Sequence, residues 1–214
     1  MTGSGPMSAS GRTPMLRRVV LLSGCLWAAP ATAAVDGDWP CVQHRVGELG
    51  AAQMWGGPPL NAGAPFREEA GLRQLAAELA ARRTPIEDAP ARIERFAREA
   101  GREKDARLTA LFAAILERIN GERGRLVAGI ESFARKQRAL AEKVKEASLA
   151  LGARGAAVGG ATGGPTASAL EDSLRWDTRI YDERNAALTY VCESPVLLEQ
   201  RAFALAREIQ THLD

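Results

Sequence analysis

The sequence has few of the residues that build metal sites and nucleophilic sites. It contains two histidines, His44 and His212, and no CxxC pair, ExxH, HExxH or CxxCH motif, nor a Gly-x-Ser-x-Gly elbow. Zinc and di-iron sites need clustered His, Cys or carboxylate ligands, and serine hydrolases need a histidine beside the nucleophile. We therefore expect no catalytic residue, no metal ligand and no cofactor, and we do not expect an enzyme.

Long hydrophobic runs are also missing, except for one near the N-terminus. There, Arg17 and Arg18 precede the apolar run VVLLSGCLWAAPATAA, which contains the small-residue pattern ATA at 31–33. This arrangement is typical of an export signal peptide, and the run is shorter than the about 20 apolar residues of a membrane span. We predict a signal peptide over residues 1–33, cleavage after Ala33, and a periplasmic or secreted mature chain without an integral membrane span.

Three other interpretations of this segment stay open. It is an N-terminal anchor, or translation starts at Met7 or Met15 rather than Met1, or LSGC marks Cys25 as a lipid-attachment site. Against the lipid anchor, about six apolar residues precede Cys25, fewer than the 7–15 of a usual signal core.

Excess charge of one sign is missing from the remainder of the chain. Removing residues 1–33 removes Arg12, Arg17 and Arg18 and no acidic residue, which takes the formal net charge from +2 to −1. A nearly neutral chain lacks the electrostatic footprint of a nucleic-acid-binding protein. We therefore expect no nucleic-acid partner.

Two cysteines, Cys41 and Cys192, remain after removal of the signal peptide. In an oxidising compartment an even number of cysteines favours a disulfide. This pair would close most of the chain into one loop, worth about 5 kcal/mol in the chain-entropy model. The alternative is a redox or metal pair in which His44, three residues after Cys41, takes part.

Aromatic and β-branched residues are sparse from about residue 67 onward, where Ala, Leu, Glu, Arg and Lys dominate. These are strong helix formers, so the predicted fold class is all-α. Residues 34–66 differ, because MWGGPPLNAGAP is rich in glycine and proline. We predict an irregular N-terminal segment there, with at most a short helix around 42–53.

Two shorter helices are predicted over 67–82 and 85–102. The first carries an apolar stripe at helical spacing, formed by Leu72, Leu75 and Leu79. For the second, Thr84 and Glu87 have the spacing of a capping box, and Gly101 is the expected stop.

A seven-residue repeat runs through residues 103–151. The positions that form it are Phe112, Leu116, Ile119, Leu126, Ile130, Phe133, Leu140, Val144, Ala147 and Leu151. Arg123 and Gln137 interrupt the repeat, and three glycines lie between 121 and 129. The repeat keeps its phase across these glycines, which a loop would not preserve. We therefore predict one long helix with coiled-coil character.

A glycine-rich turn over 152–166 then leads to a second long helix over 167–213. Together the two long helices are predicted to form an antiparallel, coiled-coil-like hairpin, with the two shorter helices packed at its base. No strand precedes the glycines and no Gly-Lys-Ser/Thr follows them, which excludes a phosphate-binding loop. The helical domain would thus span residues 67–214.

The stretch RWDTRIYDER at 175–184 is rich in Trp, Tyr and Arg, the residues enriched at binding hot spots. The candidate partner-binding residues are Trp176, Arg179, Tyr181 and Arg184, with Ile130 and Val144 on the other long helix. The alternative is internal packing, in which Asp177 and Arg184 meet Gln137 and nearby charges and fix the register of the hairpin.

Two functional hypotheses follow. The first is an exported helical-hairpin protein with a non-catalytic interaction or scaffolding role, which binds a protein partner or a second copy through the tip of the hairpin. The second is a periplasmic thiol-redox or metal-binding accessory protein that acts through Cys41, His44 and Cys192. The first requires inert cysteines, whereas the second requires an accessible thiol of lowered pKa.

Overall fold

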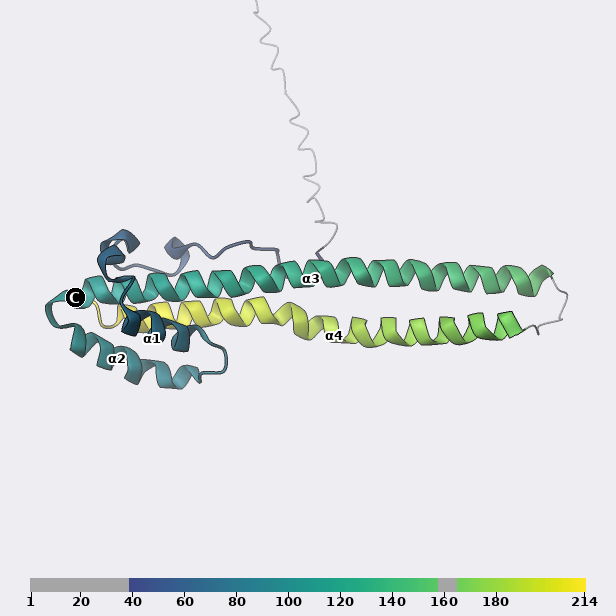
Figure 1. Cartoon of the computed structure of the whole chain (residues 1–214). Helices are drawn as coiled ribbons and strands as arrows, with labels where there is room; N and C mark the ends of the chain where they lie inside the picture. Colours follow the sequence, from purple (N-terminus) through teal and green to yellow (C-terminus); the bar gives the residue numbers. More distant parts are fainter. Residues whose placement is uncertain (1–38, 158–164) are drawn as a thin grey trace, which may run out of the picture. The chain divides into compact units, whose positions relative to one another are not determined.

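The computed structural model describes residues 39–157 and 165–214 (Figure 1). Every regular element in these two stretches is a helix, and neither contains a strand. The predicted all-α class is confirmed. The predicted signal peptide at 1–33 lies outside the described residues, and so do residues 158–164 of the predicted glycine-rich turn. The rest of the predicted turn is helical, because residues 152–157 end one long helix and residues 165–166 begin the other.

Six short helices precede the long ones among the described residues. The first five are η1 (Ala51–Gln53), η2 (Leu60–Phe66), α1 (Ala70–Ala80), η3 (Ile86–Asp88) and α2 (Ala89–Ala100). The 3-10 helix η2 packs tightly on a later part of the chain, because a Cβ added to Gly63 would lie 2.5 Å from the backbone nitrogen of Ala110. The N-terminal segment is therefore less irregular than its composition predicts.

The predicted capping box at Thr84 is wrong. The N-cap of η3 is Pro85, in extended backbone geometry, and it makes no side-chain cap hydrogen bond. The carbonyl of Thr84 instead accepts a hydrogen bond of 2.9 Å from the guanidinium of Arg201. Burial lowers the pKa of Arg201, and the charge of Glu87 opposes that shift. Arg201, far along the chain, thus binds the backbone of Thr84, which the local spacing predicts to be a cap.

The expected stop at Gly101 is confirmed. Gly101 has a φ of +56°, a conformation that L side chains rarely adopt, and it ends α2. The short helix η4 (Gly101–Glu103) follows and leads directly into α3.

The long helix α3 spans Lys104–Ala157 without a break, as predicted. Gly121, Gly124 and Gly129 lie within it, and a Cβ added at any of them would meet nothing within 4 Å. These glycines therefore occupy open faces of α3, where each costs about 1 kcal/mol of helix propensity and removes no packing contact. The second long helix, α4, spans Pro165–Gln210 and contains Pro195 in its interior.

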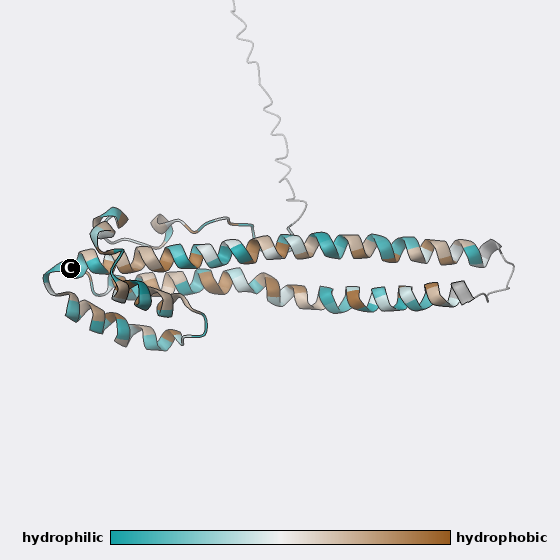
Figure 2. Ribbon diagram, viewed as in Figure 1, coloured by the Kyte–Doolittle hydropathy of each residue, from teal (hydrophilic) through white to brown (hydrophobic). Residues whose placement is uncertain are grey.

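A buried hydrophobic cluster joins all four α-helices around residues 108–119 of α3 and 198–209 of α4. Its fully buried large side chains include Leu72, Leu79, Ile93, Phe112, Ile119, Leu198, Leu205 and Ile209. Trp55 stacks on Phe112 with ring centroids 4.3 Å apart. Figure 2 shows hydrophobic and hydrophilic residues alternating along both long helices, as expected for helices that each bury one face.

Candidate functional site: a disulfide-bonded strap and an exposed face of α4

Cys41 and Cys192 form a disulfide, with their Cα atoms 5.6 Å apart. The pairing predicted from the cysteine count is therefore confirmed. Cys192 lies on α4 and is 8% exposed, while Cys41 is half-buried. Cys41 belongs to residues 39–50, which we call the strap, and the bond ties the strap to α4.

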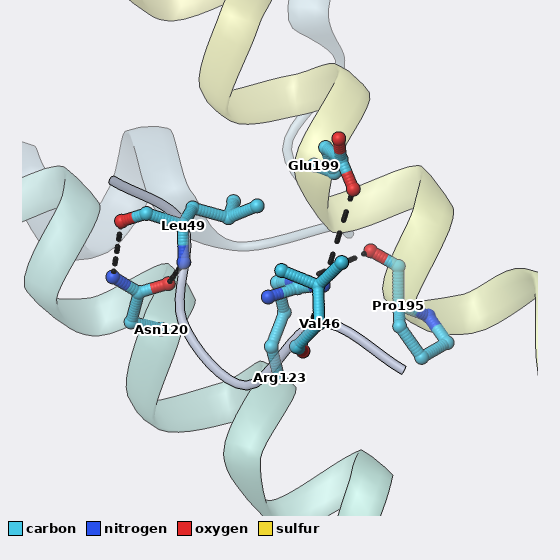
Figure 3. A network of polar contacts seen from close by, with 6 residues as sticks. All are labelled: Val46, Leu49, Asn120, Arg123, Pro195 and Glu199. Atoms are coloured by element: carbon cyan, nitrogen blue, oxygen red, sulfur yellow. Dashed lines mark hydrogen bonds and ion pairs between the residues drawn. The ribbon is translucent and has the colours of Figure 1, made fainter. Parts of the chain in front are cut away.

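Side chains of α3 hold the strap as well. The side-chain amide of Asn120 makes two hydrogen bonds with the backbone of Leu49. Its Oδ1 accepts from Leu49 N at 2.9 Å, and its Nδ2 donates to Leu49 O at 3.1 Å (Figure 3). Arg45 pairs with Glu131 at 2.5 Å. The strap is thus attached to both long helices, covalently to α4 and through polar contacts to α3.

Arg123, the first polar interruption of the heptad repeat, joins three segments. Its Nε donates to the carbonyl of Pro195 on α4 at 3.3 Å, and its Nη2 donates to the carbonyl of Val46 in the strap at 3.5 Å. Nη2 also lies 3.9 Å from the carboxylate of Glu199 (Figure 3). Burial lowers the pKa of Arg123, and the negative charge of Glu199 partly offsets this. Arginine stays protonated in proteins, so these contacts are charge-assisted.

Gln137, the second interruption, is also buried and contacts α4. Its Nε2 donates to the carbonyl of Tyr181 at 2.7 Å. Six residues further along α3, Lys143 pairs at 2.7 Å with the buried Asp177, which lies four residues before Tyr181 on α4. Asp177 therefore packs internally against a charge of α3, as the alternative of internal packing predicts, whereas Arg184 is exposed.

The candidate partner-binding residues divide into exposed and covered ones. Trp176 is 62% exposed, and Arg184 is also exposed. Arg179 is exposed too and pairs with Glu183 at 2.8 Å. Tyr181 and Val144 are half-buried, and Ile130 is 1% exposed. Only Trp176, Arg179 and Arg184 of this set are thus well placed to meet another molecule.

Two exposed residues on α4 were not among the sequence candidates. Tyr190 is 75% exposed and Leu197 is 51% exposed. Both follow Trp176 at multiples of seven residues, a signal present in the sequence.

The thiol or metal hypothesis depends on Cys41, His44 and Cys192. The two sulfurs are bonded to each other, and His44 is exposed on the strap. Over residues 39–157 and 165–214, no group of three or more His, Cys, Asp or Glu residues is placed to hold a metal ion. This geometry favours a structural disulfide.

Among the described helices, none is both long and apolar enough to cross a membrane.

Comparison with known proteins yields no match: no family model, no curated protein and no solved structure is significantly similar to this chain.

Proposed function

We propose that this protein is an exported, non-catalytic interaction or scaffolding protein, in which the two long helices form an antiparallel, coiled-coil-like hairpin. The observation that carries the proposal is the exposure of Trp176 beside Arg179 on α4. A large indole ring left in water is unfavourable, and Trp and Arg are the residues that contribute most at protein interfaces. A surface built in this way gains stability when another molecule covers it.

The hairpin arrangement is supported by the order of the contacts between α3 and α4. Arg123 meets Pro195, Gln137 meets Tyr181, and Lys143 meets Asp177. Positions that rise along α3 therefore meet positions that fall along α4, as in antiparallel helices. The heptad repeat of α3 supplies the coiled-coil character.

The proposed compartment is supported by the disulfide, because disulfides persist in the periplasm and outside the cell and are rare in the cytosol. The apolar run that ends near Ala33 has the features of a signal peptide, which would direct the chain to export. We expect the mature chain to begin at Ala34. Intact-mass measurement and thiol counting on protein from the exported fraction test this directly.

That measurement also tests the alternative function. A mature start at Ala34 with no free thiol is the expected result. Alkylatable Cys41 and Cys192 in freshly isolated, non-reduced protein, or a bound metal that depends on His44, would instead indicate the thiol-redox or metal-binding role.

Photo-crosslinking in cells that produce the full chain tests the interaction role. A photoreactive phenylalanine analogue replaces Ser173, an exposed residue that lies one turn before Trp176 on α4. The matched control places the same analogue at Glu146, an exposed residue of α3. We expect a discrete adduct from position 173 that Trp176→Ala reduces, and no such adduct from position 146. Equal, diffuse labelling from both positions would contradict the proposal.

A further inference from the structure

The strap and the two long helices together line a cavity of about 220 Å³. The residues that line it include Trp39 and Pro40 of the strap, Phe133 and Gln137 of α3, and Tyr181 and Leu188 of α4. The exposed Asn185 also lines the cavity, which therefore opens to solvent. Pockets for drug-sized molecules measure roughly 300–1,000 Å³, so this cavity suits a smaller group, such as a single ring system.

Three of the residues that line this cavity are aromatic. The whole chain has 11 aromatic residues, five Phe, four Trp and two Tyr. Trp39, Phe133 and Tyr181 belong to three separate segments, and each of them is half-buried. Aromatic rings stabilise one another in offset-stacked and edge-to-face pairs beyond the area that they bury. The lining therefore favours an aromatic occupant over an aliphatic one.

One polar side chain of the lining lacks part of its hydrogen bonding. Gln137 is 8% exposed, and its Nε2 donates to the carbonyl of Tyr181. Its Oε1 is buried and has no hydrogen-bond partner among the described residues. A buried acceptor without a donor costs free energy, so a ring that brings an N–H or O–H group to Gln137 is favoured over a purely apolar ring.

The disulfide holds the strap side of the cavity in place. Pro40 precedes Cys41, whose sulfur is bonded to that of Cys192 on α4. The indole Nε1 of Trp39 donates to the carbonyl of Gln43 at 2.6 Å, which orients the ring of Trp39 within the strap. A wall that is already ordered before a ligand arrives lowers the entropic cost of binding. The disulfide thus keeps two of the lining residues next to the long helices.

We propose that this cavity binds one aromatic ring that carries an N–H or O–H donor, of the indole or phenol type. The ring lies among Trp39, Phe133 and Tyr181, and its donor bonds Oε1 of Gln137. Such a ring comes either from a free aromatic molecule or from a Trp or Tyr side chain of another protein. The inference does not rest on the proposed interaction role, because Trp176, which carries that role, is not among the described residues that line the cavity.

Titration of the full exported chain, disulfide intact, with indole tests the site. The nuclear magnetic resonance signal of the Gln137 side-chain amide reports on this cavity, and its absence in Gln137→Leu identifies it. We expect a saturable shift with a dissociation constant of about 1 mM or below. Trp39→Ala removes one wall and should weaken indole binding at least about fivefold. Trp176→Ala, the matched control at an exposed position, should leave it unchanged.

Benzofuran tests the hydrogen bond, because it has the ring shape of indole without the N–H group. Saturation-transfer measurements on the ligands give the dissociation constants of both compounds for the wild type and for Gln137→Leu. The ratio of the benzofuran constant to the indole constant should fall at least about fivefold in Gln137→Leu, since the variant removes the acceptor. Circular dichroism checks that the variants keep their helices.

The blocked peptide acetyl-Gly-Trp-Gly-amide distinguishes the two sources of the ring. Tighter binding of this peptide than of indole would indicate a protein side chain as the occupant, and weaker binding would indicate a free molecule. Three results would each overturn the proposal: no saturable shift of the Gln137 amide at about 10 mM indole, indole binding unaffected by Trp39→Ala, or the same ratio of constants in wild type and Gln137→Leu. None of them would alter the outcome of the position-173 crosslinking that tests the interaction role.

Discussion

Two parts of the molecule are held together by different interactions. One part surrounds the buried hydrophobic cluster, and the other consists of α3 and α4 beyond that cluster. Around residues 108–119 of α3, side chains from all four α-helices exclude water and leave large residues such as Phe112 with no exposed surface. Beyond the cluster, the described contacts between α3 and α4 include the polar side chains of Arg123, Gln137 and Asp177. Apolar burial supplies most of the stability at the cluster, whereas the polar contacts specify which positions of the long helices meet.

The largest expected effect follows from removing a ring from the buried cluster. Phe112→Ala deletes a fully buried side chain that stacks on Trp55, so we expect the free energy of unfolding to fall by about 3–5 kcal/mol. Phe133→Ala, at a half-buried position of the same heptad repeat, should cost less than half as much. Urea denaturation followed by circular dichroism measures both. Equal losses would mean that the two parts are equally packed.

A smaller effect is expected from Arg123, which belongs to the part beyond the cluster. Arg123→Ala removes the donors to the carbonyls of Pro195 and Val46, and we expect a loss of about 2–3 kcal/mol. Arg125→Ala, at an exposed position two residues away, should change stability by less than about 0.5 kcal/mol. The same denaturation experiment compares them, and Arg125→Ala as costly as Arg123→Ala would show that the polar contacts add nothing specific.

The smallest effect is expected at Gln137. Its Nε2 bonds the carbonyl of Tyr181, but its Oε1 is buried without a partner among the described residues. Gln137→Leu therefore exchanges one hydrogen bond for the removal of a buried, unpaired acceptor, and the stability should change by no more than about 1 kcal/mol in either direction. A loss above about 3 kcal/mol would show that Gln137 stabilises the pair of helices rather than specifying their register.

Much of this arrangement could be predicted from local patterns. The unbroken phase of the heptad repeat across Gly121, Gly124 and Gly129 identified α3 as one helix, because those glycines lie on faces that nothing contacts. The cysteine count identified the disulfide, because only one pair was possible once residues 1–33 were set aside.

Other features depend on residues far apart in the sequence. Thr84 does not cap a helix, and its carbonyl accepts a hydrogen bond from Arg201, 117 positions away. The partners of Arg123 lie in the strap and in α4, so the sequence marks Arg123 only as an interruption in the repeat. Tyr190 and Leu197 show the same limit, because their spacing from Trp176 is visible in the sequence, but which side of α4 faces α3 depends on tertiary packing.

The separation of Cys41 and Cys192, 151 positions along the chain, sets an order of events during synthesis. At 5–20 residues per second, Cys41 exists for about 8–30 s before its partner is made. Through that interval the only other thiol in the chain is Cys25. Removal of residues 1–33, as we propose, would remove Cys25. Cys41 and Cys192 could then form an intramolecular disulfide only with each other. The finished chain would therefore need no disulfide isomerase to correct a wrong pair.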